Sequence, residues 1–171
     1  MTIILGIDPG SRITGYGVIE SDGNRSVYIA SGCVHTKSDF LPERLRIIFE
    51  SVRQLVDEHQ PHTMAIEQVF VSHNPDSALK LGQARGAAIC AGVSRGVAIG
   101  EYSPRTIKQA VVGTGRADKA QVQQMVKVLL NLSGIPPSDA ADALAVALCH
   151  SHTSKIQQHI DAQTGAPECL T

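Results

Sequence analysis

Apolar residues recur with two different periods along the chain. In the first 35 residues they run together or alternate, which is typical of strands, whereas from residue 41 onward most recur every three or four positions, which indicates helices. The first run is apolar at nearly every position and favours a strand that is covered on both faces. The pattern predicts strands at 3–8, 13–19, 27–34, 63–67 and 97–102, and helices from 41 to before Pro61 and at 75–95, 104–112, 118–132 and 138–152.

The order of these elements predicts an α/β fold with one mixed five-stranded sheet flanked by helices. A turn at residues 21–24 joins the second and third strands, so we expect three antiparallel strands first, with crossover helices attaching the other two. The order of the strands within the sheet stays open. Residues 1–153 are expected to form a single domain, and residues 154–171, which lack periodicity, to form a disordered tail.

Composition narrows the class of protein. Of the 171 residues, 43% are hydrophobic and 18% charged, which is typical of a globular domain. No apolar run approaches the ~20 residues of a membrane span, and the N-terminus lacks signal-peptide features, so we expect a cytoplasmic location and no membrane contact. The scattered cysteines favour buried thiols over a disulfide framework or a zinc site. A net charge of −1 argues against coating nucleic acid by bulk charge, but allows a basic face beside an acidic pocket.

Two of the predicted core strands end on a carboxylate. Asp8 ends the first strand and Glu67 ends the fourth. In an open α/β sheet, side chains at the carboxyl ends of neighbouring strands converge on one crevice. A simpler interpretation makes Asp8 a turn former with Pro9 and Gly10, and Glu67 a surface residue at a strand end.

The last predicted helix carries two further acids. Asp139 and Asp142 lie on one face of it, within a stretch that is otherwise small or apolar, so the helix is expected to be packed. Asp139 could instead serve only the helix dipole. Four clustered carboxylates would repel one another unless a cation neutralised them, and hard oxygen ligands suit Mg²⁺, or Mn²⁺ in its place. Two such ions ~3.5–4 Å apart promote phosphodiester hydrolysis, so a nuclease is the leading chemical class.

Four stretches of the chain occur in an informative order and spacing: GIDPGSRITGYGVIE, AIEQVF, SALKLGQARG and SDAADALAVA. Together they resemble the RuvC family of bacterial Holliday-junction resolvases, and the resemblance covers about residues 2–152. It implies a ribonuclease-H-like fold, a homodimer, and Mg²⁺-dependent nicking of two strands of like polarity in a four-way DNA junction during recombination and repair. It also implies ligatable 5′-phosphate and 3′-hydroxyl ends, and the branch-migration proteins RuvA and RuvB as partners. The family's catalytic and metal-binding tetrad falls on Asp8, Glu67, Asp139 and Asp142.

The resemblance also identifies DNA-binding residues. Phe70 matches an aromatic residue that stacks on an unpaired base at the junction centre, although a core position is the commoner fate of phenylalanine. Lys108 and Lys119 match lysines expected to contact phosphates, and Lys119 begins a helix, where free N–H groups also favour anions. His73 stands where other members carry lysine, and the tail has little basic character.

Small residues leave two questions open. Ala78, Gly82, Gly86 and Cys90 form a stripe along the predicted helix at 75–95, which suits either the homodimer interface or close packing on the protein's own sheet. Gly10, Gly15 and Gly17 could leave room for a DNA backbone or could serve hairpin geometry.

Three other functions compete with that of a resolvase. An actin-like nucleotide-binding module also places Asp-x-Gly after a strand, but it needs two lobes and a second phosphate loop. A YqgF-like nuclease of ribonuclease-H fold, acting on RNA, shares the opening motif, but AIEQVF and DAADALA favour the RuvC family. A junction-binding module without catalysis would not require all four acids.

Overall fold

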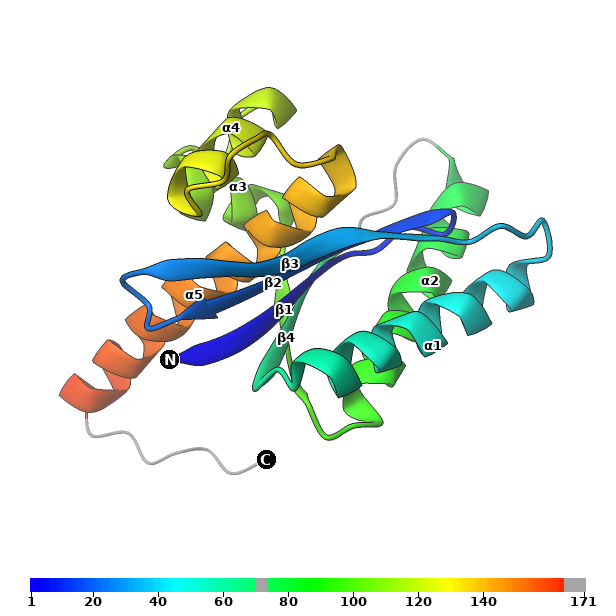
Figure 1. The fold of residues 1–171 in the computed structure, drawn as a ribbon, viewed down its shortest axis with the longest axis horizontal. Helices are drawn as coiled ribbons and strands as arrows, with labels where there is room; N and C mark the ends of the chain where they lie inside the picture. Colours follow the sequence, from blue (N-terminus) through cyan, green and yellow to red (C-terminus); the bar gives the residue numbers. More distant parts are fainter. Residues whose placement is uncertain (70–73, 165–171) are drawn as a thin grey trace.

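The computed structural model describes residues 1–69 and 74–164, and side chains as far as residue 154. Its five strands are β1 (Thr2–Asp8), β2 (Ile13–Ser21), β3 (Ser26–His35), β4 (Thr63–Glu67) and β5 (Ala98–Tyr102). They form one sheet in the order β3-β2-β1-β4-β5 (Figure 1). β2 is antiparallel to β1 and β3, whereas β1, β4 and β5 are mutually parallel. The predicted mixed five-stranded α/β fold is confirmed, and the strand order is new.

Helices cover both faces of the sheet. One face carries α1 (Leu41–His59) and α2 (Pro75–Val93), which pack against each other. The other face carries α5 (Ser138–Thr164), flanked by α3 (Pro104–Val112) and α4 (Lys119–Leu129) (Figure 1). β1 is therefore buried on both sides, as its unbroken apolar run predicts. Leu5 and Ile7 belong to the core under α1 and α2, and Ile4 to the core under α5.

Three glycines let α5 lie unusually close to the sheet. An added Cβ at Gly15 would lie 2.0 Å from the carbonyl oxygen of Asp139, and one at Gly6 would lie 2.1 Å from that of Ala143. Gly17, which pairs with Gly6 across β1 and β2, would meet Leu144 at 2.7 Å. Gly15 and Gly17 therefore make room for α5. This role differs from the two that were predicted for them, which were room for a DNA backbone and hairpin geometry.

The last helix is longer than its apolar pattern indicates. The prediction ended the helix at His152, but α5 continues to Thr164, so residues 154–164 are helical rather than part of an irregular tail. The reason is the local composition. Lys, Gln and Ala in SKIQQHIDAQ are good helix formers, and residues 154–164 contain neither Gly nor Pro. The expectation of a single domain over residues 1–153, followed by a tail, stays a prediction, and residues 165–171 lie outside the described residues.

The described helices also bear on membrane association. None of those within residues 1–69 and 74–164 combines the length and apolar character needed to cross a bilayer.

Candidate active site

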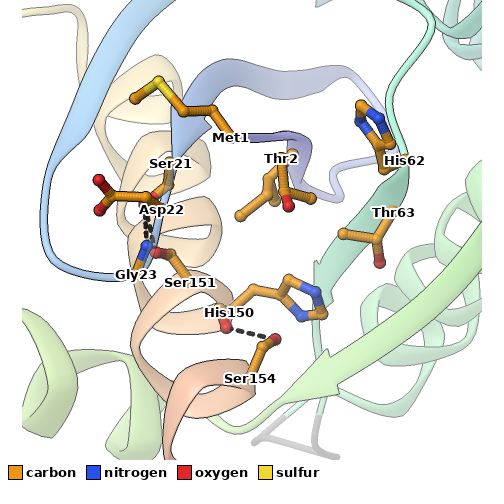
Figure 2. A pocket seen from close by; sticks show the side chains of 11 residues that line it. Met1, Thr2, Ser21, Asp22, Gly23, His62, Thr63, His150, Ser151 and Ser154 are labelled. Atoms are coloured by element: carbon orange, nitrogen blue, oxygen red, sulfur yellow. Dashed lines mark hydrogen bonds between the residues drawn. The ribbon is translucent and has the colours of Figure 1, made fainter. Parts of the chain in front are cut away.

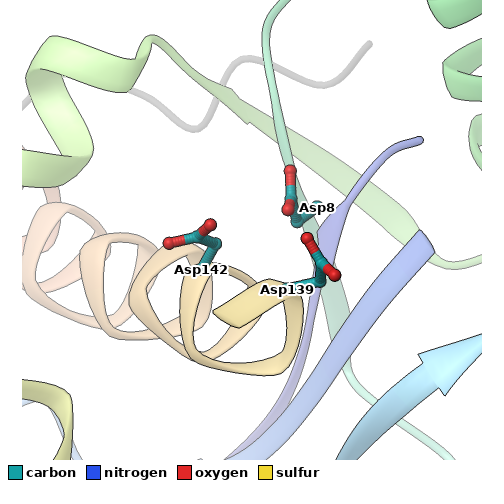
Figure 3. A group of neighbouring side chains, drawn as sticks. All are labelled: Asp8, Asp139 and Asp142. Atoms are coloured by element: carbon teal, nitrogen blue, oxygen red, sulfur yellow. The ribbon is translucent and has the colours of Figure 1, made fainter. Parts of the chain in front are cut away.

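Three of the four predicted acids meet at one edge of the sheet. Asp8 ends β1, while Asp139 and Asp142 lie in the first turns of α5, whose start is held against β2 at Gly15. One carboxylate oxygen from each of the three lies within 4.8 Å of the others (Figure 3). β1 therefore ends, just before Pro9 and Gly10, at the point where the carboxylate of Asp8 meets those of Asp139 and Asp142.

Glu67 reaches the same place from the neighbouring strand. Because β1 and β4 are parallel, their carboxyl ends lie at one edge of the sheet. Glu67 and Asp142 line a cavity of about 240 Å³, whose other walls include Lys108, Lys119 and the apolar side chain of Ile107. Glu67 is also close enough for its charge to raise the pKa of Asp8. Asp142 thus belongs both to the cluster of three aspartates and to the cavity that Glu67 lines.

Burial and crowding make two of the acids hold their protons unusually tightly. Burial, followed by the charges of Glu67, Asp142 and Asp139, raises the pKa of Asp8 from 3.8 to about 8. Burial and the charge of Asp142 raise the pKa of Glu67 to about 7, although Lys108 and Lys119 oppose the change. Like charges in a poorly solvated place are unstable alone, so the site favours a bound cation.

Two lysines face the acids rather than a distant surface. Lys119 is the first residue of α4, whose start is fixed by a capping box between Asp118 and Gln121. Its Nζ lies 2.8 Å from Oδ2 of Asp142, and this contact raises the pKa of Lys119. Lys108 lies on α3 and lines the same cavity. Both lysines were predicted as DNA-binding residues from the family resemblance. The ion pair between Lys119 and Asp142 was not predicted, because it depends on how α4 and α5 pack.

Phe70, predicted to stack on a base, lies outside the described residues, as does His73. Their predicted roles are therefore neither supported nor opposed by the structure.

A larger cavity of about 470 Å³ lies at the opposite end of β1 and β4 (Figure 2). Several of its polar groups already have hydrogen-bond partners. The hydroxyls of Ser21 and Ser151 are 2.7 Å apart, and the hydroxyl of Ser154 donates to the carbonyl oxygen of His150 at 2.7 Å. None of the clustered aspartates lines this larger cavity, so the smaller acidic cavity is the candidate active site.

The acidic donor set fits a hard divalent cation. The three clustered aspartates supply only oxygen ligands, without cysteine or histidine, and Glu67 can add a fourth carboxylate. The mixed sheet has this strand order, and the acids lie at the ends of its central strands and on the helix that crosses it. This arrangement defines a ribonuclease-H-like protein with an acidic site of the kind that binds divalent metal ions.

Sequence comparison identifies the family. The profile of crossover junction endodeoxyribonuclease RuvC matches residues 4–150, and the chain belongs to this family. It is 59% identical over 155 residues to the crossover junction endodeoxyribonuclease RuvC of Psychromonas ingrahamii, covering 91% of this chain and 90% of that protein. The RuvC of Pseudoalteromonas atlantica is 61% identical over the same length, with the same coverage.

Solved structures agree with the fold. Thermus thermophilus RuvC in complex with a Holliday junction substrate superposes with a TM-score of 0.87 at 33% identity, covering 92% of this chain and 97% of that one. The yeast mitochondrial Holliday junction resolvase Ydc2 gives a TM-score of 0.71 at 15% identity, covering 95% of this chain and 82% of that one, and shows the fold alone. The family match excludes the actin-like and YqgF-like alternatives.

Proposed function

We propose that this protein is a Holliday-junction resolvase, a metal-dependent endonuclease that symmetrically nicks two strands of like polarity in a four-way DNA junction. The products are ligatable 5′-phosphate and 3′-hydroxyl ends, and the activity serves homologous recombination and DNA repair. The observation that carries the proposal is the meeting of Asp8, Asp139 and Asp142, with Glu67 beside them, in a member of the RuvC family. A cytoplasmic location and cooperation with RuvA and RuvB belong to the same proposal, as does stacking of Phe70 on an unpaired base.

Asp8, Glu67, Asp139 and Asp142 would hold the metal, with Mg²⁺ as the proposed ion, two per site, and Mn²⁺ able to replace it. When bound, such ions lower the pKa of the attacking water and stabilise the leaving oxygen. The carboxylates must first lose their protons, and the raised pKa values of Asp8 and Glu67 make this step pH-dependent. Lys108 and Lys119 bring positive charge to the rim of the acidic cavity, where a phosphate of the substrate would lie.

The experiment that tests this function compares two DNA substrates. The purified protein is incubated with a mobile synthetic four-way junction and with a linear duplex of the same sequence, each with and without Mg²⁺. The junction should be nicked at symmetric positions only when Mg²⁺ is present, and the duplex should stay intact. Equal cutting of the duplex would overturn the resolvase proposal.

Replacing Lys119 by alanine should weaken junction binding and make it less dependent on salt. Each lysine that contacts a phosphate contributes about one to the slope of log Kd against log salt concentration. The slope is measured without divalent metal, for Lys119→Ala and Lys108→Ala alike. Lys127→Ala is the matched control, because this lysine lies in the last turn of the same helix α4 and should leave the slope unchanged. Unchanged slopes for Lys108 and Lys119 would remove them from the DNA surface.

The small residues of α2 favour the dimer over packing within the chain. Its buried residues are Ala84, Ala88, Ala91 and Gly92. At Gly82 and Gly86, by contrast, an added Cβ would meet no heavy atom of the described residues within 4 Å. Exposed apolar side chains lie at the two ends of the face that carries Gly82 and Gly86, with Leu79 69% exposed and Val93 56% exposed. We propose that α2 packs against α2 of a second copy, so that a two-fold dimer presents two sites to a two-fold junction.

Gly86→Leu is therefore expected to convert the dimer to a monomer without unfolding it. The new side chain would block close contact between the helices of two copies, but it has open space within its own chain. Light scattering gives the mass and thermal unfolding gives the Tm. Gly134→Leu, at a glycine with equally open surroundings outside α2, is the control and should stay dimeric. A Gly86→Leu protein that remains dimeric would exclude α2 from the interface.

A further inference from the structure

Arg85 connects α2 to the strand end that carries Glu67. Its guanidinium Nε donates to the carbonyl oxygen of Glu67 at 3.1 Å, and its Nη2 forms an ion pair with the carboxylate of Glu101 on β5. The side chain is only 19% exposed. Arg85 therefore spans three elements, α2, β4 and β5, at the edge of the candidate active site.

The backbone at Glu67 needs such a partner because the sheet holds it only in part. The pairing of β1 with β4 reaches Ile7 and Ile66, so Glu67 lies one residue beyond it. On the other side, Glu67 pairs with Tyr102 of β5, and the amide of Gln68 donates to the carbonyl oxygen of Tyr102 at 2.8 Å, while the carbonyl oxygen of Glu67 accepts from Arg85. The hydrogen bond from Arg85 thus fixes the peptide group between Glu67 and Gln68, and with it the direction in which the Glu67 side chain leaves the backbone.

We propose that Arg85 is a positioning residue that orients Glu67 toward the metal, an inference that rests on the proposed function. It acts through the carbonyl oxygen and not through its charge, because that charge is paired with Glu101. Replacing a residue that hydrogen-bonds to a metal ligand and orients it typically lowers metal affinity or activity by about 10–100-fold.

The test uses two substitutions of Arg85 and two controls. Arg85→Lys keeps a cation beside Glu101 but loses the planar, two-pronged donor. Arg85→Gln removes the charge as well. Glu101→Gln removes the ion pair but leaves the Nε donor in place. Arg95→Gln is the matched control, because Arg95 follows the same helix and pairs with the carboxylate of Asp57, away from the site.

Three quantities are measured for the full chain. They are the Mg²⁺ concentration that half-saturates the rise in Tm, the single-turnover rate at which the bound junction is nicked, and the junction Kd with its salt slope in the absence of Mg²⁺. Both Arg85 variants should need about tenfold more Mg²⁺ and cleave at least about tenfold more slowly, with Kd and salt slope unchanged. Glu101→Gln should change either quantity less than about threefold, and Arg95→Gln should change neither.

Two results would overturn the assignment of Arg85. One is wild-type Mg²⁺ dependence and cleavage rate in both variants, and the other is a loss confined to junction binding with a reduced salt slope. The rate is counted per bound complex and Arg85→Lys preserves the ion pair, so partial unfolding of Arg85→Gln does not obscure the result. If the wild-type protein fails to cut junctions, the proposed function fails, but the Mg²⁺-dependent rise in Tm still decides whether Arg85 positions Glu67.

Discussion

Asp8→Asn is expected to lower junction cleavage by at least about 10³-fold while leaving junction binding intact. The substitution keeps the size of the side chain but removes the charge at the centre of the acidic cluster, where the metal would be held. Single-turnover cleavage and the junction Kd without Mg²⁺ are the two measurements. Asp22→Asn, in the turn after β2 at the far end of the sheet, is the control and should cleave at the wild-type rate. Residual cleavage within tenfold of wild type would exclude Asp8 from the reaction.

The same substitution should stabilise the metal-free protein at alkaline pH. The pKa of Asp8 is about 8 in the folded protein against an ordinary value of 3.8, so between these values the folded state binds more protons than the unfolded chain. The free energy of unfolding contributed by Asp8 therefore falls as the pH rises from about 4 to about 8. Glu67, with a pKa of about 7, acts in the same direction. In EDTA, the Tm of Asp8→Asn should exceed that of wild type at pH 8 and approach it near pH 5. Equal Tm values at pH 8 would contradict the repulsion inferred for the site.

Gly15→Ala is the second substitution expected to have a large effect, although Gly15 contributes no side chain to the site. Its new Cβ would lie 2.0 Å from the carbonyl oxygen of Asp139, so the first turn of α5 must move away from β2. That movement displaces Asp139 and Asp142 relative to Asp8. We expect cleavage to fall by about 10²-fold or more, and overpacking to lower the free energy of unfolding by about 1–3 kcal/mol.

The control for Gly15→Ala is Gly134→Ala, where an added Cβ meets no heavy atom of the described residues within 4 Å. It should leave both cleavage and stability near the wild-type values. Wild-type cleavage by Gly15→Ala would mean that the spacing between β2 and α5 does not set the geometry of the acids.

Local patterns predicted the elements better than their arrangement. The strand Thr63–Glu67 and the helix Pro104–Val112 were predicted with their observed bounds, because their apolar residues and flanking prolines are local signals. The position of β1 between β2 and β4 could not be predicted, since it depends on contacts between distant parts of the chain. The end of α5 was misplaced because the apolar pattern fades after His152, although the helix-forming composition continues.

Asp8 and Glu67 could be predicted from the sequence because of where they lie in their strands. Asp8 and Glu67 end parallel strands, and the position of a residue along its strand can be inferred from the local pattern. The groups that hold these acids in place could not be inferred in this way. The ion pair of Lys119 with Asp142 and the hydrogen bond from Arg85 to Glu67 join residues that are close only in the folded chain. Gly15 and Gly17 were predicted to leave room for a DNA backbone or to serve hairpin geometry, whereas they lie on the face of β2 that α5 approaches closely.

The most direct test of the account is anomalous diffraction from crystals of the protein grown near pH 8.5 with Mn²⁺. An anomalous peak from Mn²⁺ should appear at the cluster of Asp8, Asp139 and Asp142. The Nζ of Lys119 should then have withdrawn from Asp142, and the same crystals of Asp8→Asn should show the peak weakened or lost. Full anomalous data at saturating Mn²⁺ with no peak at these carboxylates would contradict the claim that they form a metal centre.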